Sequence, residues 1–431
     1  MRKFRSIDDD FASSFEAFLN EQREAPADVR GTVADILTAV RKHGDSALLE
    51  ATRKFDRMPA LADVSALRVD EKEIAEARMS CSPDMLAALE LAAARIRSFH
   101  ERQKPQDLDY TDNEGIRLGA LWKPLDAVGL YVPGGTASYP SSVLMNAVPA
   151  RVAGVKRLVM ASPTPEGNMN PAVLVAAAIA GVDEIWRIGG AQAIGALAYG
   201  TASIRAVDKI VGPGNAWVAE AKRQVFGTVG IDMVAGPSEI LVVADKSANP
   251  RWVAADLLSQ AEHDTAARAL LITDDEDLAC EVGFEISAAL STLPRADIAR
   301  ESIEKHGAIM VIPNLHDAVD LINRIAPEHL ELMVERPEAL LSGIHHAGAV
   351  FLGHYTPEAI GDYIAGPSHV LPTAATARFS SGLSVYDFLK KMSLIQCSGD
   401  GFRKLASAAA TLADSEGLDA HALSLRARLN H

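Results

Sequence analysis

The segment DKIVGPGN, residues 208–215, contains the pattern that decides the fold class of this chain. Its apolar run, Lys209 to Val211, has the length of a strand and leads into a turn of two glycines and a proline that opens a helix. Such a turn lets backbone N–H groups approach a phosphate, although a single one is more often only a tight turn. The segment therefore predicts a strand-turn-helix unit of the kind that builds α/β proteins.

Two further glycine-rich turns follow apolar runs earlier in the chain. The run at 128–132 leads into the turn at 133–136, and the run at 184–188 leads into the turn at 189–192. Ligands of open α/β sheets bind at the carboxyl ends of strands, so three such turns in one unit favour a nucleotide or another phosphate-bearing ligand. None of the three has the spacing GxGxxG, so the ordinary dinucleotide fingerprint is absent.

Strand-length apolar runs alternate with helical stretches in two series. The first series comprises 128–132, 157–160, 184–188 and 209–211. The second comprises 239–243, 269–272, 308–312, 330–334 and 349–352. This alternation predicts parallel sheets covered by helices, and the break at 233–237 predicts two α/β units. Whether the two units arose by duplication stays open.

The two ends of the chain show helical spacing instead. Apolar residues such as Phe11, Phe15 and Phe18 indicate helices near the N-terminus, and an alanine-rich helix is expected from 71 to 103. The predicted division is a helical N-terminal region at 1–115, a first α/β domain at 116–235, a second at 236–380 and a helical C-terminal arm at 381–431. A helical arm after a finished α/β core is expected to dock on its own body or on a partner subunit.

Composition limits the classes of protein that this chain can belong to. With 42 Lys+Arg and 57 Asp+Glu among 431 residues, the net charge of −15 argues against a nucleic-acid partner. The longest apolar run, 171–182, is shorter than the roughly 18 residues that span a bilayer, and the N-terminus lacks the apolar core of a secretion signal. Three widely separated cysteines form no disulfide framework, so we expect a cytoplasmic protein without a membrane partner.

Four polar clusters are candidates for chemistry. Gln260 and His263 share one face of a predicted helix, and Glu328 and His329 form an adjacent acid–imidazole pair. Taken alone, the first pair is more often a polar helix end and the second more often surface decoration. The other clusters are Asp362 with His369 in a glycine-containing loop, and Glu416 with His421 in the tail. Gln260, His263, Asp362 and His421 together would complete a metal coordination sphere of nitrogen and oxygen.

The cluster residues lie within longer strings, which are VGLYVPGGT at 128–136, GAQA at 190–193, DKIVGPGN at 208–215, AGPSE at 235–239, SQAEH at 259–263, PEHL at 327–330, GDY at 361–363, HVLPT at 369–373 and ARFSS at 377–381. Taken together and in this order, they resemble the histidinol dehydrogenases over essentially the whole chain. The resemblance implies a homodimeric, zinc-dependent enzyme of the last step of histidine biosynthesis, which oxidises L-histidinol through L-histidinal to L-histidine with two NAD⁺. It also implies an α/β fold of two similar three-layer α/β/α domains with incomplete Rossmann-like sheets, plus N- and C-terminal helical arms that intertwine in the dimer.

The resemblance also implies roles for individual residues. Gln260, His263 and Asp362 match zinc ligands, His421 matches a fourth ligand from the partner subunit, and Glu328 and His329 match the catalytic pair. The substrate-binding positions implied are Ser238, Gln260, His263, His329, Asp362, His369, Glu416 and His421. The NAD-binding positions implied are Tyr131, Gln192 and Asn215.

The mechanism expected from these residues has two oxidations. His329 is the expected general base, because imidazole can be unprotonated near pH 7. The aldehyde step needs either a thiohemiacetal on cysteine or a hydrate, and no cysteine lies in a motif-like stretch. We therefore expect a hydrate, with Glu328 activating the water. The family resemblance further implies that zinc anchors the substrate nitrogens.

Two alternatives stay open at this point. One is a related NAD- and zinc-dependent dehydrogenase of another polar alcohol, such as a sulfonated diol. The other is a metal-bound dimer that binds nucleotides without turnover, against which the adjacent Glu328 and His329 argue, since mere binding does not require them.

Overall fold

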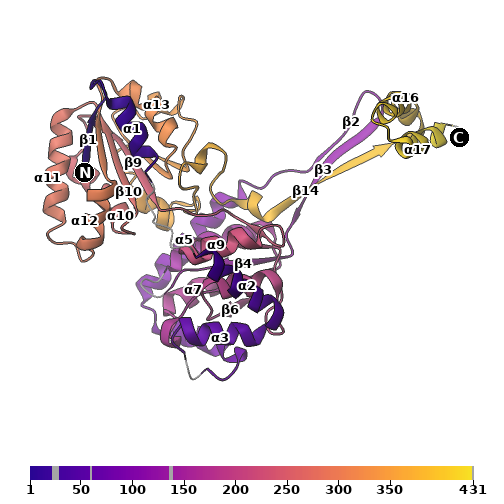
Figure 1. Cartoon of the computed structure of the whole chain (residues 1–431), viewed down its shortest axis with the longest axis horizontal. Coiled ribbons are helices and arrows are strands. Elements are labelled where there is room, and N and C mark those ends of the chain that lie inside the picture. The colour runs from indigo at the N-terminus through magenta and orange to yellow at the C-terminus, as the bar shows by residue number, and fades with distance from the viewer. Residues whose placement is uncertain (22–28, 59–60, 135–138, 430–431) are drawn as a thin grey trace.

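Two parallel sheets, each covered by helices on both faces, form the body of the chain, and a narrow arm projects from it (Figure 1). The computed structural model describes residues 1–431 except 22–28, 59–60, 135–138 and 430–431. Gly135 and Thr136, from one of the predicted glycine-rich turns, therefore lie outside the described residues. The α/β fold class predicted from the two strand series is confirmed.

The first sheet has five parallel strands. Their order is β6 (Glu184–Trp186), β5 (Arg157–Ala161), β4 (Ala127–Tyr131), β7 (Lys209–Val211) and β8 (Gly230–Ile231). The helices that follow these strands are α6 (Pro140–Ala153), α7 (Pro171–Ala180), α8 (Gly190–Tyr199) and α9 (Ala216–Val225). The central strand β4 pairs through Leu130 with Met160 on one side and Val211 on the other, and all three side chains are buried. Continuous apolar strands of this kind are typical of a sheet buried on both faces.

Helices from the N-terminal region complete the layers of the first unit. They are α2 (Arg30–His43), α3 (Asp45–Phe55), α4 (Glu71–Ser80) and α5 (Pro83–Glu101). One face of the sheet packs on α4 to α7 and the other on α2, α3, α8 and α9. The single helix expected at 71–103 is two helices, because Ser82 caps a new start by accepting a hydrogen bond from Met85 N, with Pro83 at the first helical position.

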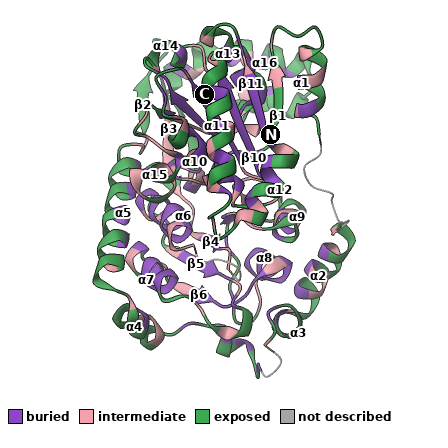
Figure 2. Cartoon of the chain, turned by 90° about the vertical axis from the view of Figure 1, so that its left-hand side faces the viewer, coloured by how far each residue is buried: buried purple, intermediate pink, exposed green. Residues whose placement is uncertain are grey.

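The second sheet has six parallel strands. Their order is β1 (Arg2–Arg5), β11 (Ala308–Val311), β10 (Arg268–Thr273), β9 (Glu239–Ala244), β12 (His329–Met333) and β13 (Ala349–Leu352). The helices α10 (Pro250–Ala261), α11 (Glu276–Ala289) and α12 (Ala296–His306) cover one face, and α1 (Phe11–Leu19) and α13 (Ala318–Ile325) cover the other. Figure 2 shows the strands of both units buried under helices whose outer faces are exposed.

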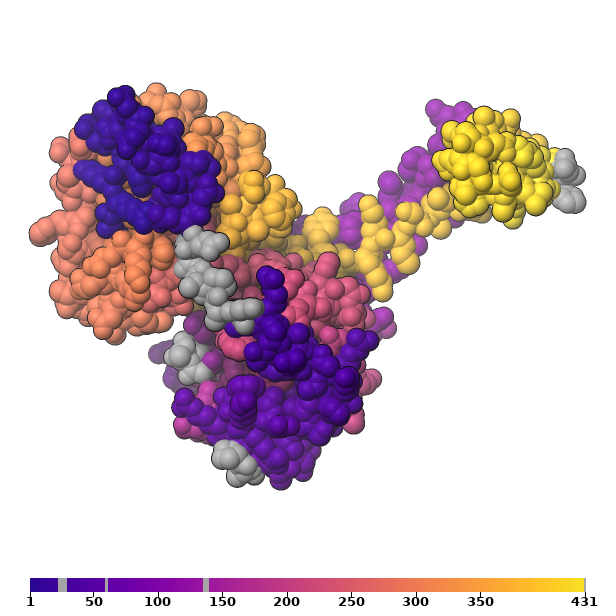
Figure 3. Space-filling view, in the orientation of Figure 1, coloured from indigo at the N-terminus to yellow at the C-terminus, as the bar shows by residue number. Residues whose placement is uncertain are grey.

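The N-terminal residues belong to the second unit, although the sequence predicts only helix there. Strand β1 pairs in parallel with β11, from Arg2 opposite Ala308 to Arg5 opposite Val311. Phe15 and Phe18 of α1 are buried in the same core, and Figure 3 shows this indigo segment seated on the second unit. The strand was not predicted because three of its four residues are charged and only Phe4 is apolar.

The projecting arm is built from both ends of the chain. Strands β2 (Leu108–Thr111), β3 (Ile116–Pro124) and β14 (Leu389–Cys397) form an antiparallel sheet, and α16 (Gly399–Ser415) and α17 (Asp419–Leu429) lie at its tip (Figure 1). The helices α16 and α17 were predicted, but none of the three strands was, and the segment 381–431, predicted as helical, contains the strand β14. The mostly exposed residues of β2 and β14 explain why no apolar run marks them. The domain boundaries at 115, 235 and 380 stay predictions.

Among the described residues, no helix combines the length and the apolar character that crossing a membrane requires.

Candidate active site

A cavity of about 340 Å³ lies where the two sheets face each other, and both units line it. From the first unit come Gly212 and Asn215, which follow the carboxyl end of β7. From the second come Ser238, just before β9, and Glu328 and His329, at the start of β12. The cavity therefore lies between the carboxyl ends of the first sheet and the amino ends of the second. Ligands of open α/β sheets usually bind at the carboxyl ends of strands, and only the first sheet presents those ends to this cavity.

The imidazole of His329 is the centre of the polar group in this cavity. Its Nδ1 bonds the backbone oxygen of Glu239 at 3.1 Å and lies 3.7 Å from Glu358 Oε1 and 3.9 Å from Glu328 Oε2. Its Nε2 lies 3.6 Å from Asp362 Oδ1 and, among the described residues, has no hydrogen-bond partner. The Nε2 nitrogen is thus buried beside the cavity without a bonded neighbour, as expected of an atom that meets substrate.

The carboxyl of Glu328 is held by the backbone of β9, the strand that pairs with β12 in the sheet. Its Oε2 accepts a hydrogen bond from Glu239 N at 2.9 Å, and its side chain is buried. Burial raises the pKa of Glu328 to about 8. A carboxyl with a pKa in this range exchanges protons near neutral pH, which is the property of a general acid or base.

The acidic surroundings also act on the imidazole. Burial lowers the pKa of His329, but the negative charges of Glu358 and Glu328 and the contact with Asp362 outweigh it, so the pKa lies well above 6.5. Burial raises the pKa of Glu358 to about 7 despite the opposite effect of His329. Three carboxyl groups thus surround one imidazole, so a positive charge placed among them would favour their ionised forms.

A cation would find suitable ligand atoms here. One atom each from His329, Glu358 and Asp362 can be chosen so that all three lie within 4.8 Å of one another. His263 lies close enough to Asp362 for that carboxylate to oppose the lowering of its pKa by burial. In the amide orientation that satisfies its neighbours, the Gln260 nitrogen donates to Glu358 Oε1 at 3.2 Å. This nitrogen and oxygen donor set suits Zn²⁺.

The structure brings most of the predicted metal and substrate residues together. Gln260, His263, Asp362, Ser238 and His369 all line the cavity that contains the Glu328–His329 pair. The exceptions are Glu416, at the end of α16, and His421, in α17, which lie at the tip of the arm and not at this cavity (Figure 1).

His369 has its own partners in the cavity wall. Its Nδ1 lies 2.9 Å from the backbone oxygen of Asp362 and its Nε2 lies 3.3 Å from Ser142 Oγ. Burial lowers the pKa of His369, so the neutral imidazole is favoured. With both ring nitrogens in hydrogen-bond contact, the orientation of the His369 ring in the cavity wall is fixed.

The three predicted cofactor residues all follow strands of the first sheet. Tyr131 ends β4, and its hydroxyl accepts a hydrogen bond from Gly190 N at 3.1 Å, beside Gln192 in the first turn of α8. Asn215 caps α9 by accepting hydrogen bonds from Trp217 N and Val218 N at 3.2 Å each. Of the three, only Asn215 lines the described cavity, whereas the side chains of Tyr131 and Gln192 are almost fully buried.

Glu358 was missed by the sequence analysis. It begins the short helix α15 (Glu358–Ile360), directly after Pro357, and a glutamate at a helix start is usually exposed. Its burial depends on packing beside β12, where its backbone N–H donates to Glu331 Oε1 at 2.5 Å. No local sequence pattern predicts that a glutamate at such a position is buried.

The cysteines lie elsewhere. Cys81 is half-buried behind α4, Cys280 and Cys397 are exposed, and none of them is among the described residues that line the cavity. This placement agrees with a mechanism that uses no thiol.

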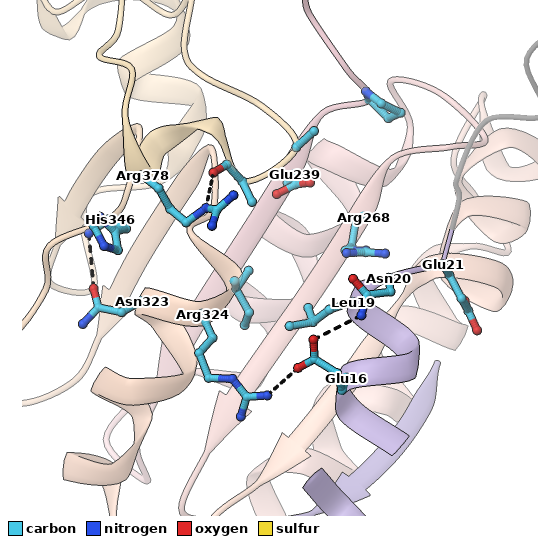
Figure 4. Close-up of a pocket in the computed structure, with 14 residues that line it drawn as sticks. Glu16, Leu19, Asn20, Glu21, Glu239, Arg268, Asn323, Arg324, His346 and Arg378 are labelled. Atoms are coloured by element: carbon cyan, nitrogen blue, oxygen red, sulfur yellow. Dashed lines mark hydrogen bonds and ion pairs between the residues drawn. The ribbon is translucent and has the colours of Figure 1, made fainter. Parts of the chain in front are cut away.

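A second cavity, of about 740 Å³, lies in the second unit at the amino ends of its strands (Figure 4). Arginines from three elements line it, and Arg324 pairs with Glu16 at 2.7 Å. Arg378 donates to the backbone oxygen of Ala375 at 3.1 Å. The acid–imidazole group belongs to the smaller cavity, which is therefore the candidate active site.

The fold and the smaller cavity define an α/β enzyme in which glycine-rich turns of one sheet face an acid–imidazole group of the other. The sequence pattern of the histidinol dehydrogenases matches residues 19–429. Histidinol dehydrogenase 1 of Trichormus variabilis is 55% identical over 430 residues, covering 100% of this chain and 99% of the relative. Histidinol dehydrogenase of Ruegeria pomeroyi is 58% identical over 421 residues, covering 98% and 97%.

Structural comparison agrees. The crystal structure of histidinol dehydrogenase from Elizabethkingia anophelis matches with a TM-score of 0.94 at 35% identity, covering 100% of this chain and 98% of that chain. The chain belongs to the histidinol dehydrogenase family, and it is an oxidoreductase that acts on a small-molecule substrate. The family predicted from the sequence strings is confirmed.

Proposed function

We propose that the cavity between the sheets oxidises L-histidinol through L-histidinal to L-histidine with two NAD⁺. The observation that carries this proposal is the buried His329, surrounded by Glu328, Glu358 and Asp362, in a cavity that the Gly212–Asn215 turn also lines. Hydride transfer from an alcohol needs a proton acceptor beside the nucleotide, and His329 lies in the same cavity as the glycine-rich turn that we propose to bind NAD⁺.

In the first oxidation, His329 accepts the hydroxyl proton as the hydride leaves the alcohol carbon for NAD⁺. The atom proposed for this role is Nε2, because it is the ring nitrogen without a bonded neighbour while Nδ1 bonds Glu239 O. With the carboxylate of Asp362 neutralised by a bound cation, His329 loses part of the cause of its raised pKa and accepts a proton near neutral pH.

In the second oxidation, Glu328 takes a proton from the water that adds to the aldehyde. His329, protonated in the first oxidation, gives its proton to the carbonyl oxygen as the water adds, so that the neutral hydrate forms and His329 is again unprotonated. The hydrate then loses its hydride to a second NAD⁺ while His329 accepts one of its hydroxyl protons. Glu328 suits this role because its hydrogen bond from Glu239 N fixes the carboxyl while its raised pKa makes it a stronger base than an ordinary glutamate.

Gln260, His263 and Asp362 are the proposed Zn²⁺ ligands of this chain, with His421 of the partner subunit as the fourth. Zn²⁺, when bound, anchors the amine and imidazole nitrogens of the substrate and so orients the reacting carbon.

Substrate and cofactor positions complete the proposal. Ser238, His369 and Glu416 of the partner subunit hold the substrate together with the metal-site residues, and Tyr131, Gln192 and Asn215 hold NAD⁺. This requires a homodimer, because Glu416 and His421 lie on an arm that reaches away from the cavity of its own chain (Figure 3). The cytoplasmic location stays a prediction.

The experiment that tests this function counts NADH formed per L-histidinol consumed by the zinc-loaded protein. We expect about two, since two hydrides leave each substrate. A value of one would contradict the aldehyde step. A sulfonated diol in parallel tests the alternative substrate class, and faster oxidation of the diol than of histidinol would favour it.

A further inference from the structure

A fully buried ion pair lies in the cavity wall beneath the glycine-proline-glycine turn. Lys222 of α9 pairs with Asp232, which follows β8, and the two side chains are only 2% and 1% exposed. Both residues line the cavity, yet the proposed mechanism uses neither of them. Burying two charges is costly unless each is also hydrogen-bonded, so the further partners of this pair show what it holds in place.

Those partners are the two polar groups of one residue, Gly212. Asp232 Oδ2 accepts a hydrogen bond from Gly212 N at 2.7 Å, and Lys222 Nζ donates to Gly212 O at 2.9 Å. The N–H and C=O groups of Gly212 are thus held from both sides by two opposite charges that also neutralise each other. Hydrogen bonds to charged groups are shorter and stronger than those between neutral groups.

Gly212 also has no freedom to move away. Its φ of +111° is in the range that favours glycine, and a Cβ at this position would lie 2.1 Å from Tyr131 O. The turn is therefore packed on the backbone of Tyr131 and held by the ion pair. Both contacts act on the segment that ends in Asn215.

Asn215 has only half of its amide available to a ligand. Its Oδ1 accepts hydrogen bonds from Trp217 N and Val218 N, so its Nδ2 is the group left to donate into the cavity. The direction of Nδ2 depends on the backbone of the turn three residues earlier. Asp232 Oδ1 also accepts a hydrogen bond from Met233 N at 2.6 Å, at the start of the segment that leads to Ser238.

We propose that Lys222 and Asp232 are positioning residues for the cofactor: their ion pair holds Gly212 and thereby directs Asn215 toward NAD⁺. The inference rests on the proposed NAD⁺ site. It assigns a role to two residues that touch neither substrate nor metal, and it predicts that loss of the pair weakens cofactor binding more than it slows the chemical steps.

The test compares Lys222→Met with Arg157→Met in the full-length, zinc-loaded protein. Arg157 is the control because it forms a mostly buried ion pair with Glu184, at 2.7 Å, in the same sheet but at the amino ends of its strands, away from the cavity; its side chains are 13% and 16% exposed, more than those of Lys222 and Asp232. Calorimetry with NAD⁺ and steady-state kinetics measure the effect, and thermal unfolding shows that each variant is folded.

We expect Lys222→Met to raise the Kd and the KM for NAD⁺ at least about tenfold while kcat at saturating NAD⁺ changes little. Arg157→Met is expected to lower stability without changing either constant. An unchanged Kd in folded Lys222→Met, or equal weakening in both variants, would overturn the inference. If Lys222→Met does not fold, Asp232→Asn replaces it, because it removes the negative charge of the pair, and one of the two oxygens that accept from Gly212 N and Met233 N, at nearly unchanged size, and the same criteria apply.

Amide hydrogen exchange separates this inference from the proposed function. The Gly212 amide is expected to be protected in the unaltered protein and in Arg157→Met, and to exchange faster in Lys222→Met. If the unaltered protein bound no NAD⁺, the proposed cofactor site would fail, whereas equal Gly212 exchange in all variants would refute the ion-pair contact itself.

Discussion

Glu328→Gln separates the two oxidations, because only the second is proposed to need the Glu328 carboxylate. The substitution is nearly isosteric, and the glutamine oxygen can still accept the hydrogen bond that Glu328 Oε2 receives from Glu239 N at 2.9 Å. The position of His329, whose Nδ1 bonds Glu239 O, is therefore expected to persist. What the variant loses is the ability to take a proton from water.

The magnitude follows from the raised pKa and from the usual contribution of a general base. Since burial raises the pKa of Glu328 to about 8, only about 10% of the carboxyl is ionised at pH 7 and about 90% at pH 9. Aldehyde oxidation by the unaltered, zinc-loaded enzyme should therefore rise with pH as Glu328 ionises, with a midpoint below pH 8 because the nearby cation favours the carboxylate. Glu328→Gln should lower the plateau about 10²-fold, which is about 2.7 kcal/mol of barrier.

The assay uses L-histidinal in both directions. Oxidation of histidinal with NAD⁺ reports the hydrate step, whereas reduction of histidinal with NADH reports the alcohol step without any hydrate. The variant should lose the first activity and its pH dependence while the second stays close to that of the unaltered enzyme.

Two results would refute this reasoning. Equal loss in both directions would mean that Glu328 serves the alcohol step or the architecture of the site. Unimpaired oxidation of histidinal would remove Glu328 from water activation and direct attention to Glu358, the other buried carboxyl beside His329.

Four further predictions follow from the same site. His329→Asn should lower kcat with histidinol about 10²-fold or more, measured as NADH formation, and near-normal turnover would exclude His329 as the base. Changing Cys81, Cys280 and Cys397 together to serine should leave turnover nearly intact, and an inactive triple variant would restore the thiohemiacetal route. Removing metal with a chelator should abolish NADH formation and added Zn²⁺ should restore it, so a fully active metal-free enzyme would contradict the zinc proposal. After removal of metal, the free energy of unfolding should depend on the protonation of Glu328, because burial raises its pKa from 4.5 to about 8. The stabilisation by the protonated carboxyl is full below about pH 4.5 and is lost as pH rises through 8, by up to about 5 kcal/mol. Glu328→Gln should flatten this part of the pH profile of stability measured by denaturant unfolding.

The buried parallel strands could be predicted from the sequence and the exposed ones could not. The predicted runs 239–243 and 269–272 match β9 and β10 to within one residue at each end, because a strand buried on both faces is a continuous apolar run. Strands β1 and β14 carry mostly charged or exposed residues, so their pairing is decided by partners far away in the chain. No local pattern contains that information.

The site residues also divide into those that a sequence pattern reveals and those that only the packing of distant segments reveals. Glu328 and His329 were visible as an adjacent pair, yet the pair alone is usually surface decoration, and its importance came from the wider resemblance. Glu358 had no signal at all, since its burial follows from how α15 packs beside β12. The Lys222–Asp232 pair likewise unites two residues that are unremarkable in their own segments.

The place of β1 at the edge of the second sheet has a consequence for synthesis of the chain. Strand β1 is synthesised long before its partner β11, since Arg2 pairs with Ala308, 306 residues later. At about 5–20 residues per second, that delay is roughly 15–60 s. During this interval the first unit has all of its strands and can fold, while Phe15 and Phe18 lack the core that buries them. These two aromatic side chains therefore stay without their native core in the nascent chain until the second sheet forms.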